Sequence, residues 1–86
     1  MNLPPVVDER RWARLRWRCR RGMLENDIVL ERWLMRTDRT VLTEDDIVAL
    51  DQLLDLDDNS LWDLLSGRAD SHDGEMQRLV RQLRSV

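Results

Sequence analysis

The sequence predicts an all-α protein, a single small bundle of five short helices. Three observations support this fold class: apolar residues recur at intervals of three and four, helix-capping residues stand before several of the apolar runs, and the chain has only three Gly and two Pro. The 86 residues, 42% hydrophobic and 36% charged, suit one soluble helical domain with a modest core. A large active-site cleft is therefore not expected.

The domain organisation follows from the start of the chain. Residues 1–8 are expected to form an extended lead-in, because Pro4 and Pro5 do not fit inside a helix. Residues 9–86 then form one helical domain.

The first helix is expected from Glu9 to about Arg20. Arginines fill much of it, beside apolar residues at helical spacing. These apolar residues are Trp12, Leu15 and Cys19 in one row, with Ala13 and Trp17 in a second row beside it. Gly22 follows as a natural helix end, since glycine adopts positive φ without steric cost.

The second helix is expected from Leu24 to Arg36, with a broad apolar stripe. The stripe has two rows, with Leu24 and Ile28 in one and Val29, Trp33 and Leu34 in the other. The third helix is expected from Glu44 to Leu54, with Thr43 as its cap and acidic residues in its first turn.

Two more helices complete the bundle. Asp57 or Asp58 is expected to cap a short fourth helix that runs through Leu65 and is terminated by Gly67, and Asp73 is expected to cap the last helix. In the last helix, apolar residues recur at i, i+3, i+4 and i+7, and these are Met76, Leu79, Val80 and Leu83.

Charge is distributed unevenly along the chain. All 14 basic residues are arginine and seven of them lie between Arg10 and Arg21, whereas the chain from Thr43 to Asp63 carries acidic charges only. The formal net charge of −3 argues against a general nucleic-acid binder. The distribution suits either steering towards a partner of opposite sign or a set of solvated helix faces.

The four tryptophans divide into two pairs. Trp33 and Trp62 are expected in the core. Trp12 and Trp17 lie among charges and are the better candidates for a contact surface.

The sequence offers no catalytic set, so we expect a protein that is not an enzyme. The only histidine, His72, lies in a polar turn, and Cys19 falls on the apolar row of the first helix. The clustered acids from Asp45 to Asp58 lack the spacing of a calcium-binding loop, so no metal site is expected. No run is long enough to span a membrane, and the single cysteine fits a reducing cytoplasmic compartment.

Residues 20–27 concentrate charge around a glycine corner. Glu25 and Asp27 fall in the first turn of the second helix, where the helix dipole favours anions. Arg21, just before the corner, is placed to bridge to Glu25. A capped, salt-bridged corner explains this pattern as well as a binding surface does.

The segment Arg21–Glu25, which reads Arg-Gly-Met-Leu-Glu, resembles the Arg-Gly-x-x-Glu signature of the succinate dehydrogenase flavinylation factors, the SdhE family. The similarity continues through residues 42–46 and 53–65 and covers most of the chain from residue 11 to residue 67. In two respects the chain departs from that family: Asn26 stands where an apolar residue is usual, and the sequence has no Phe or Tyr.

The resemblance implies a bundle that binds the flavoprotein subunit of succinate dehydrogenase, and often that of fumarate reductase. It implies that the factor promotes covalent attachment of FAD to a histidine of that subunit, without a stably bound cofactor of its own. We expect such a helper to be cytoplasmic and monomeric when free. The partner-binding residues that the resemblance implies are Arg20, Arg21, Gly22, Met23, Glu25 and Asp27.

Within this set, Arg21 is expected to contact a carboxylate or the flavin side, and Glu25 a basic or hydrogen-bonding group. Gly22 is expected to let the partner's backbone come close. The alternative function is an antitoxin-like regulatory module that binds a toxin or nucleic acid.

Overall fold

The computed structural model describes residues 6–85, and every regular element within that range is helical. The elements are α1 (Glu9–Arg18), α2 (Leu24–Arg36), the 3₁₀ turn η1 (Arg39–Val41), α3 (Glu44–Leu54), α4 (Asp58–Leu65) and α5 (Gly74–Arg84). The predicted all-α fold with five helices is therefore confirmed. Pro4 and Pro5 of the expected lead-in lie outside the described residues.

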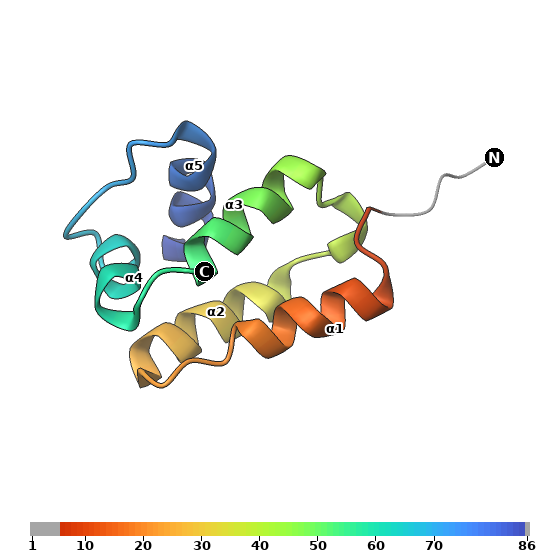
Figure 1. The fold of residues 1–86 in the computed structure, drawn as a ribbon, viewed down its shortest axis with the longest axis horizontal. Helices are drawn as coiled ribbons and strands as arrows, with labels where there is room; N and C mark the ends of the chain where they lie inside the picture. Colours follow the sequence, from red (N-terminus) through yellow and green to blue (C-terminus); the bar gives the residue numbers. More distant parts are fainter. Residues whose placement is uncertain (1–5, 86) are drawn as a thin grey trace.

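The helices form two groups. In Figure 1, α1 and α2 run antiparallel to each other, and α3 crosses above them. The short helix α4 and the helix α5 close the end of the bundle where α2 begins. α5 packs against α3, α2 and α4, and α4 also packs against α2. The turn between α3 and α4 is thereby brought to the same end as the turn between α1 and α2.

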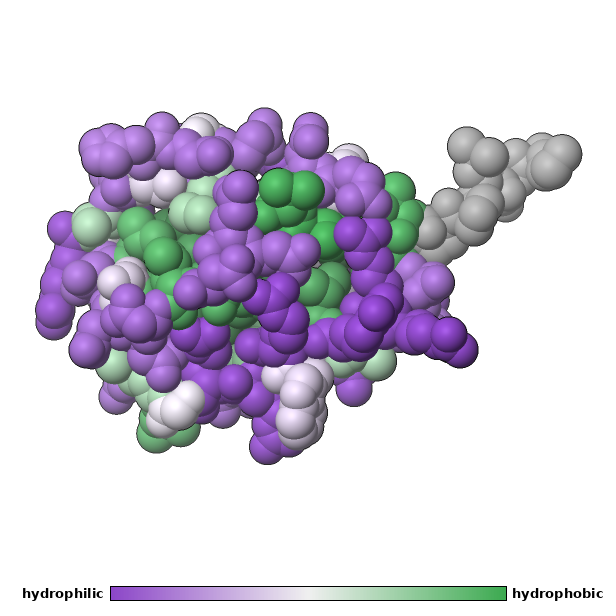
Figure 2. All heavy atoms as spheres, viewed as in Figure 1, coloured by the Kyte–Doolittle hydropathy of each residue, from purple (hydrophilic) through white to green (hydrophobic). Residues whose placement is uncertain are grey.

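A single hydrophobic core lies between these helices. Figure 2 shows a face that is hydrophilic over most of its area, with hydrophobic side chains visible towards its middle. Val7 is fully buried although it precedes the first helix, and its carbonyl oxygen accepts a hydrogen bond from Arg39 Nη1 at 2.9 Å. The helical core residues include Leu15, Leu30, Trp33, Ile47, Leu50, Leu53, Leu61, Val80 and Leu83.

The inner face of α2 differs from the prediction. Leu24 and Ile28, expected in the apolar stripe, are 66% and 39% exposed. The buried row is instead Asn26, Leu30 and Trp33. The helical spacing was right, but the buried row begins with a polar residue, so hydrophobicity alone pointed to the wrong side of the first turn.

The helix ends differ from the prediction in one place. α1 ends at Arg18 rather than Arg20, because the Arg20 N–H bonds to the Trp17 carbonyl oxygen in a tighter i to i−3 turn. Gly22, expected at positive φ, does not adopt it, and among residues 6–85 only Gly67 does, with φ of 87°.

Side-chain caps begin four of the five α-helices. Asp8 accepts a hydrogen bond from the Arg11 N–H at 2.8 Å, and Thr43 closes a capping box at the start of α3. Asp57 and Asp73 cap α4 and α5. The exception is α2, where Met23 is the N-cap residue and supplies no side-chain hydrogen bond.

Ion pairs join the arginine-rich α1 to the acidic α3. Arg11 pairs with Glu44 at 2.7 Å, and Arg18 pairs with Asp51 and, at 2.8 Å, with Asp55. The uneven charge distribution in the sequence is therefore partly used inside the fold. No helix within residues 6–85 has the length and apolar character to cross a membrane.

Candidate functional site

The side chain of Arg21 points into the molecule, towards the turn that joins α3 to α4. Its Nε donates to Asp58 Oδ1 at 2.8 Å, its Nη1 donates to the carbonyl oxygen of Leu54 at 2.8 Å, and its Nη2 donates to that of Leu56. The carbonyl of Leu54 is one that the end of α3 leaves without a helical partner. Arg21 therefore caps the end of one helix while it pairs with the first residue of the next.

Asp58 collects hydrogen bonds from the corner between α1 and α2. Besides Arg21, Oδ1 accepts from Asn26 Nδ2 at 3.2 Å, and Oδ2 accepts from the Met23 N–H at 3.1 Å. The hydrogen bond from Arg21, aided by those from Asn26 and Met23, holds the pKa of Asp58 below its ordinary value. The Asp58 carboxylate thus serves as the cap that α2 does not have within its own sequence.

The expected bridge between Arg21 and Glu25 is wrong. Glu25 is exposed and forms no ion pair with any residue in the range 6–85. Asp27 is the acid that closes the corner locally, since its Oδ1 accepts a hydrogen bond from the Arg21 N–H at 3.0 Å. The guanidinium group of Arg21 instead pairs with the carboxylate of Asp58, 37 residues further along the chain. The packing of α4 on α2 brings this carboxylate close.

Asn26 is fully buried, and it ties α2 to α4. Its Nδ2 donates to the backbone oxygen of Asp58 at 2.9 Å as well as to the carboxylate. Both neighbours are acceptors, so the amide nitrogen must face them. Its Oδ1 is the one buried side-chain nitrogen or oxygen atom within residues 6–85 that lacks a hydrogen-bond partner. The departure from the usual apolar residue here adds a polar contact to the Asp58 cluster.

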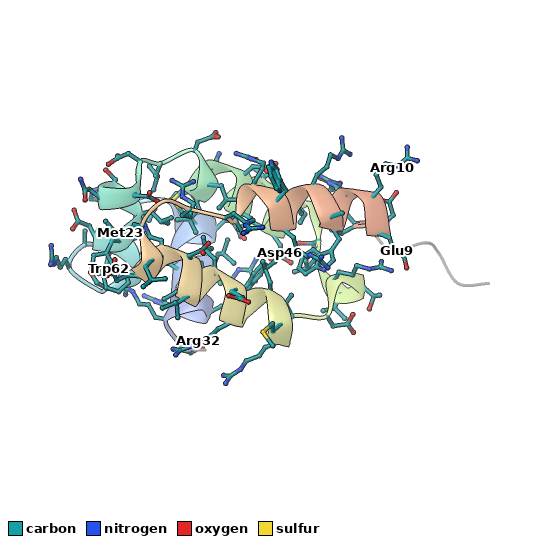
Figure 3. All side chains as sticks on the ribbon, turned by 90° about the horizontal axis from the view of Figure 1, so that it is seen from below. Glu9, Arg10, Met23, Arg32, Asp46 and Trp62 are labelled. Atoms are coloured by element: carbon teal, nitrogen blue, oxygen red, sulfur yellow. The ribbon has the colours of Figure 1, made fainter. Side chains whose placement is uncertain are left out.

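The remaining candidate residues lie at the surface of this corner. Arg20, Gly22 and Glu25 are exposed, and Met23 and Asp27 are half-buried. A Cβ atom added to Gly22 would lie 3.5 Å from Asp58 Oδ2, an ordinary contact distance. In Figure 3, Met23 and Trp62 lie together at one end of the molecule, and Glu9 and Arg10 lie at the other.

A groove of about 500 Å³ runs between α1 and α2 and reaches the same corner. Arg16 and Arg20 line its α1 side, and Asp27 and Glu31 line its α2 side. Its apolar lining comes from Trp12, Cys19, Leu34 and Met35. Burial raises the pKa of the Cys19 thiol to about 12, which keeps it protonated at neutral pH.

The tryptophans follow the prediction in part. Trp33 is buried as expected, while Trp62 is half-buried and packs against the core. Trp12 also packs against the core, so it is not a free contact residue. Trp17 is 73% exposed and remains the candidate for a contact surface.

Sequence reasoning missed the central role of Asp58. The pair Asp57-Asp58 signalled a helix cap, which Asp57 supplies, but nothing in the local pattern marked Asp58 as the counter-ion of Arg21. Within residues 6–85, no group of three or more His, Cys, Asp or Glu side chains is placed to hold a metal ion.

The fold and this corner define a class of protein: a small helical bundle in which the turn between two helices lies at the surface and is held by hydrogen bonds to a third helix. Within that class, the chain belongs to the family described as the flavinator of succinate dehydrogenase, whose family model matches residues 13–86. The resemblance noted in the signature is thereby confirmed.

Relatives in three bacteria carry the name FAD assembly factor SdhE. The chain is 57% identical to that of Ralstonia nicotianae over 61 residues, which are 71% of this chain and 63% of the relative. It is 38% identical to that of Coxiella burnetii over 73 residues, 85% and 88% of the two chains. It is 39% identical to that of Legionella pneumophila strain Lens over 80 residues, 92% and 98% of the two chains.

Proposed function

We propose that this protein binds the flavoprotein subunit of succinate dehydrogenase and promotes covalent attachment of FAD to a histidine of that subunit. The corresponding subunit of fumarate reductase is the second expected partner. Membership of the flavinator family supports this proposal, as do relatives named FAD assembly factor. The observation that carries it to particular residues is the exposed corner of Arg20, Gly22 and Glu25, held in place from beneath by the contact of Arg21 with Asp58.

The bond forms between groups of the partner in this proposal, so the helper contributes orientation and electrostatics. Holding two reacting groups in a productive geometry removes a large part of the reaction barrier. Glu25 is well placed for such a role, since it is exposed and lies in the first turn of α2. We place Arg20, Gly22, Met23 and Asp27 around it in the contact with the partner.

Two further properties belong to the same proposal. The factor acts in the cytoplasm, a compartment in which the free Cys19 thiol stays reduced. It is a monomer when free and holds no FAD of its own between encounters with the partner.

The test is covalent flavin on the dehydrogenase subunit in cells with and without the gene for this protein. After denaturing electrophoresis, only covalently attached flavin fluoresces in the gel. We expect the fluorescent band of the subunit to fade in the deletion strain and to return with the gene. An unchanged band in the deletion strain would contradict the proposal. The fumarate reductase subunit is scored in the same gel.

One observation favours the alternative of nucleic-acid binding. Trp17 is exposed among arginines that form no ion pair within residues 6–85, an arrangement that suits stacking on bases. These arginines are Arg10, Arg14, Arg16 and Arg20. Retention on single-stranded DNA or RNA that falls steeply with salt, together with unchanged flavin attachment, would establish this alternative instead.

A further inference from the structure

We propose that Asp58 is the positioning residue of the functional corner, and that Arg21 acts through Asp58 instead of touching the partner. Asp58 holds Arg21, Met23 and Asn26 together. It thereby fixes the orientation of the first turn of α2, from which the Glu25 side chain projects. This inference rests on the proposed function and deepens it.

The hydrogen-bond donors of the Arg21 side chain are engaged within this chain. Nε and both terminal nitrogens each donate to an acceptor in the turn between α3 and α4, and the side chain is 14% exposed. An arginine presented to a partner would keep its guanidinium fork in solvent for a bidentate contact. Here the fork is already occupied by this chain's own groups.

The N-cap residue of α2, Met23, supplies no side-chain hydrogen bond to the helix. Every other α-helix begins with an aspartate or threonine that accepts a backbone N–H within its own first turn. At α2 the Met23 N–H goes to Asp58 Oδ2 at 3.1 Å instead. The start of α2 is thus anchored by α4, so a change at Asp58 is transmitted to Glu25, two residues after Met23.

The Asp58 carboxylate binds residues on both sides of Gly22. Arg21 lies before Gly22 in the chain and Asn26 lies after it, and both donate to Asp58 Oδ1. A carboxylate that binds both sides of a turn restricts its conformation more than a contact with either side alone. Loss of the Asp58 charge would free both sides together.

The structure offers a matched control for this cluster. Arg84 at the end of α5 donates through Nε to the Leu64 oxygen at 2.8 Å, and through Nη2 to the Ala69 oxygen at 2.8 Å and Asp70 Oδ1 at 3.0 Å. It therefore also joins one carboxylate to two backbone oxygens. None of its hydrogen bonds reaches residues 20–27.

The experiment is a double-mutant cycle read by flavin attachment. Arg21→Gln, Asp58→Asn and the double variant are each supplied to the deletion strain, beside Arg84→Gln and Asp70→Asn as controls. The initial rate of covalent flavin formation is compared at a temperature where circular dichroism shows every variant folded. Arg21→Gln and Asp58→Asn are each expected to lower the rate about tenfold or more, and the double variant is expected to show no further loss. The controls should stay within about twofold of the wild type.

Two results would overturn the inference. If the losses of the two single variants multiply in the double variant, Arg21 contributes independently of Asp58. If Asp58→Asn stays within about twofold of the wild type, Asp58 does not position the corner. If Asp58→Asn does not fold, Asp58→Glu takes its place with the same expected loss, because the added methylene displaces both oxygens while keeping the charge.

A second readout separates this inference from the proposed function. Amide hydrogen exchange of Met23 to Asp27 in the isolated protein should quicken in Asp58→Asn and stay unchanged in Asp70→Asn. Unchanged exchange at Met23 in Asp58→Asn counts against the inference. If the wild-type protein does not support flavin attachment, the proposed function fails, while the exchange measurement still tests how Asp58 holds the corner.

Discussion

The ring centroids of Trp12 and Trp33 lie 6.2 Å apart, with their planes inclined by 52°. This pair is the main aromatic contact between α1 and α2. The other links of α1 to the bundle include ion pairs of Arg11 and Arg18 whose side chains are 32% and 40% exposed. Exposed ion pairs contribute little to stability. The attachment of α1 therefore depends mainly on apolar burial around Trp33.

Replacing Trp33 by Ala should lower the free energy of unfolding by about 3 kcal/mol or more, because a buried indole leaves a cavity. Trp17→Ala is the matched control and should change it by less than about 0.5 kcal/mol, because that side chain is 73% exposed. Urea unfolding followed by far-ultraviolet circular dichroism measures both. Equal losses of unfolding free energy for the two variants would contradict the assignment of Trp33 as the buried residue to which α1 attaches.

Gly22→Arg and Glu25→Ala should leave the fold intact while abolishing support of flavin attachment. Gly22 has no positive φ, a Cβ atom there meets only Asp58 Oδ2 at 3.5 Å, and Glu25 is exposed. Melting curves and in-gel flavin fluorescence measure the two properties. Arg32→Ala, at an exposed position of α2 that Figure 3 shows away from Met23, should retain activity. If Gly22→Arg or Glu25→Ala unfolds the protein, these residues serve the stability of the fold and not the contact with a partner.

Gly67→Ala should destabilise the protein by about 1 kcal/mol, because φ is 87° at this residue and a Cβ atom is disfavoured there. No steric contact is responsible, since nothing lies within 4 Å of the added Cβ. Gly74→Ala, inside the first turn of α5 and also without a nearby atom, is the control and should be neutral or stabilising. Thermal melting distinguishes them, and a loss at Gly74 larger than at Gly67 would refute the backbone argument.

Cys19 should resist alkylation in the folded protein. It is 3% exposed, and burial raises the pKa of its thiol to about 12, so little thiolate exists at pH 8. Iodoacetamide labelling followed by mass spectrometry should be slow in buffer and fast in urea. Rapid labelling without denaturant would mean that the groove between α1 and α2 opens readily.

Stability should fall in acid below pH 4. The pKa of Asp58 is lowered by the hydrogen bond from Arg21, and that of Asp70 by the hydrogen bonds from Arg84 and Gln77. A carboxyl whose folded pKa lies below its ordinary value of 3.8 stabilises the fold above that pH and loses this contribution as the pH falls further. Urea midpoints between pH 6 and pH 3 measure the effect. Asp58→Asn should flatten this dependence; a curve as steep as that of the wild type would contradict the assignment.

The sequence by itself determined the helices. Their periodicity is local, because a helix is specified by residues three and four positions apart. The caps Thr43 and Asp73 are local too, whereas the sequence left Asp57 and Asp58 as alternatives for α4, and the structure selects Asp57. The signature from Arg21 to Glu25 was likewise readable without a structure, because its residues are consecutive.

Only the tertiary structure decided the partner of Arg21. Glu25, Asp27 and Asp58 are all carboxylates, and the nearest in sequence was the natural expectation. The packing of α4 against α2 and the buried amide of Asn26 selected Asp58 instead. Ion-pair choice depends on distances that helix docking sets, and no local pattern encodes those distances. For the same reason, the burial of Asn26 became visible only in the fold.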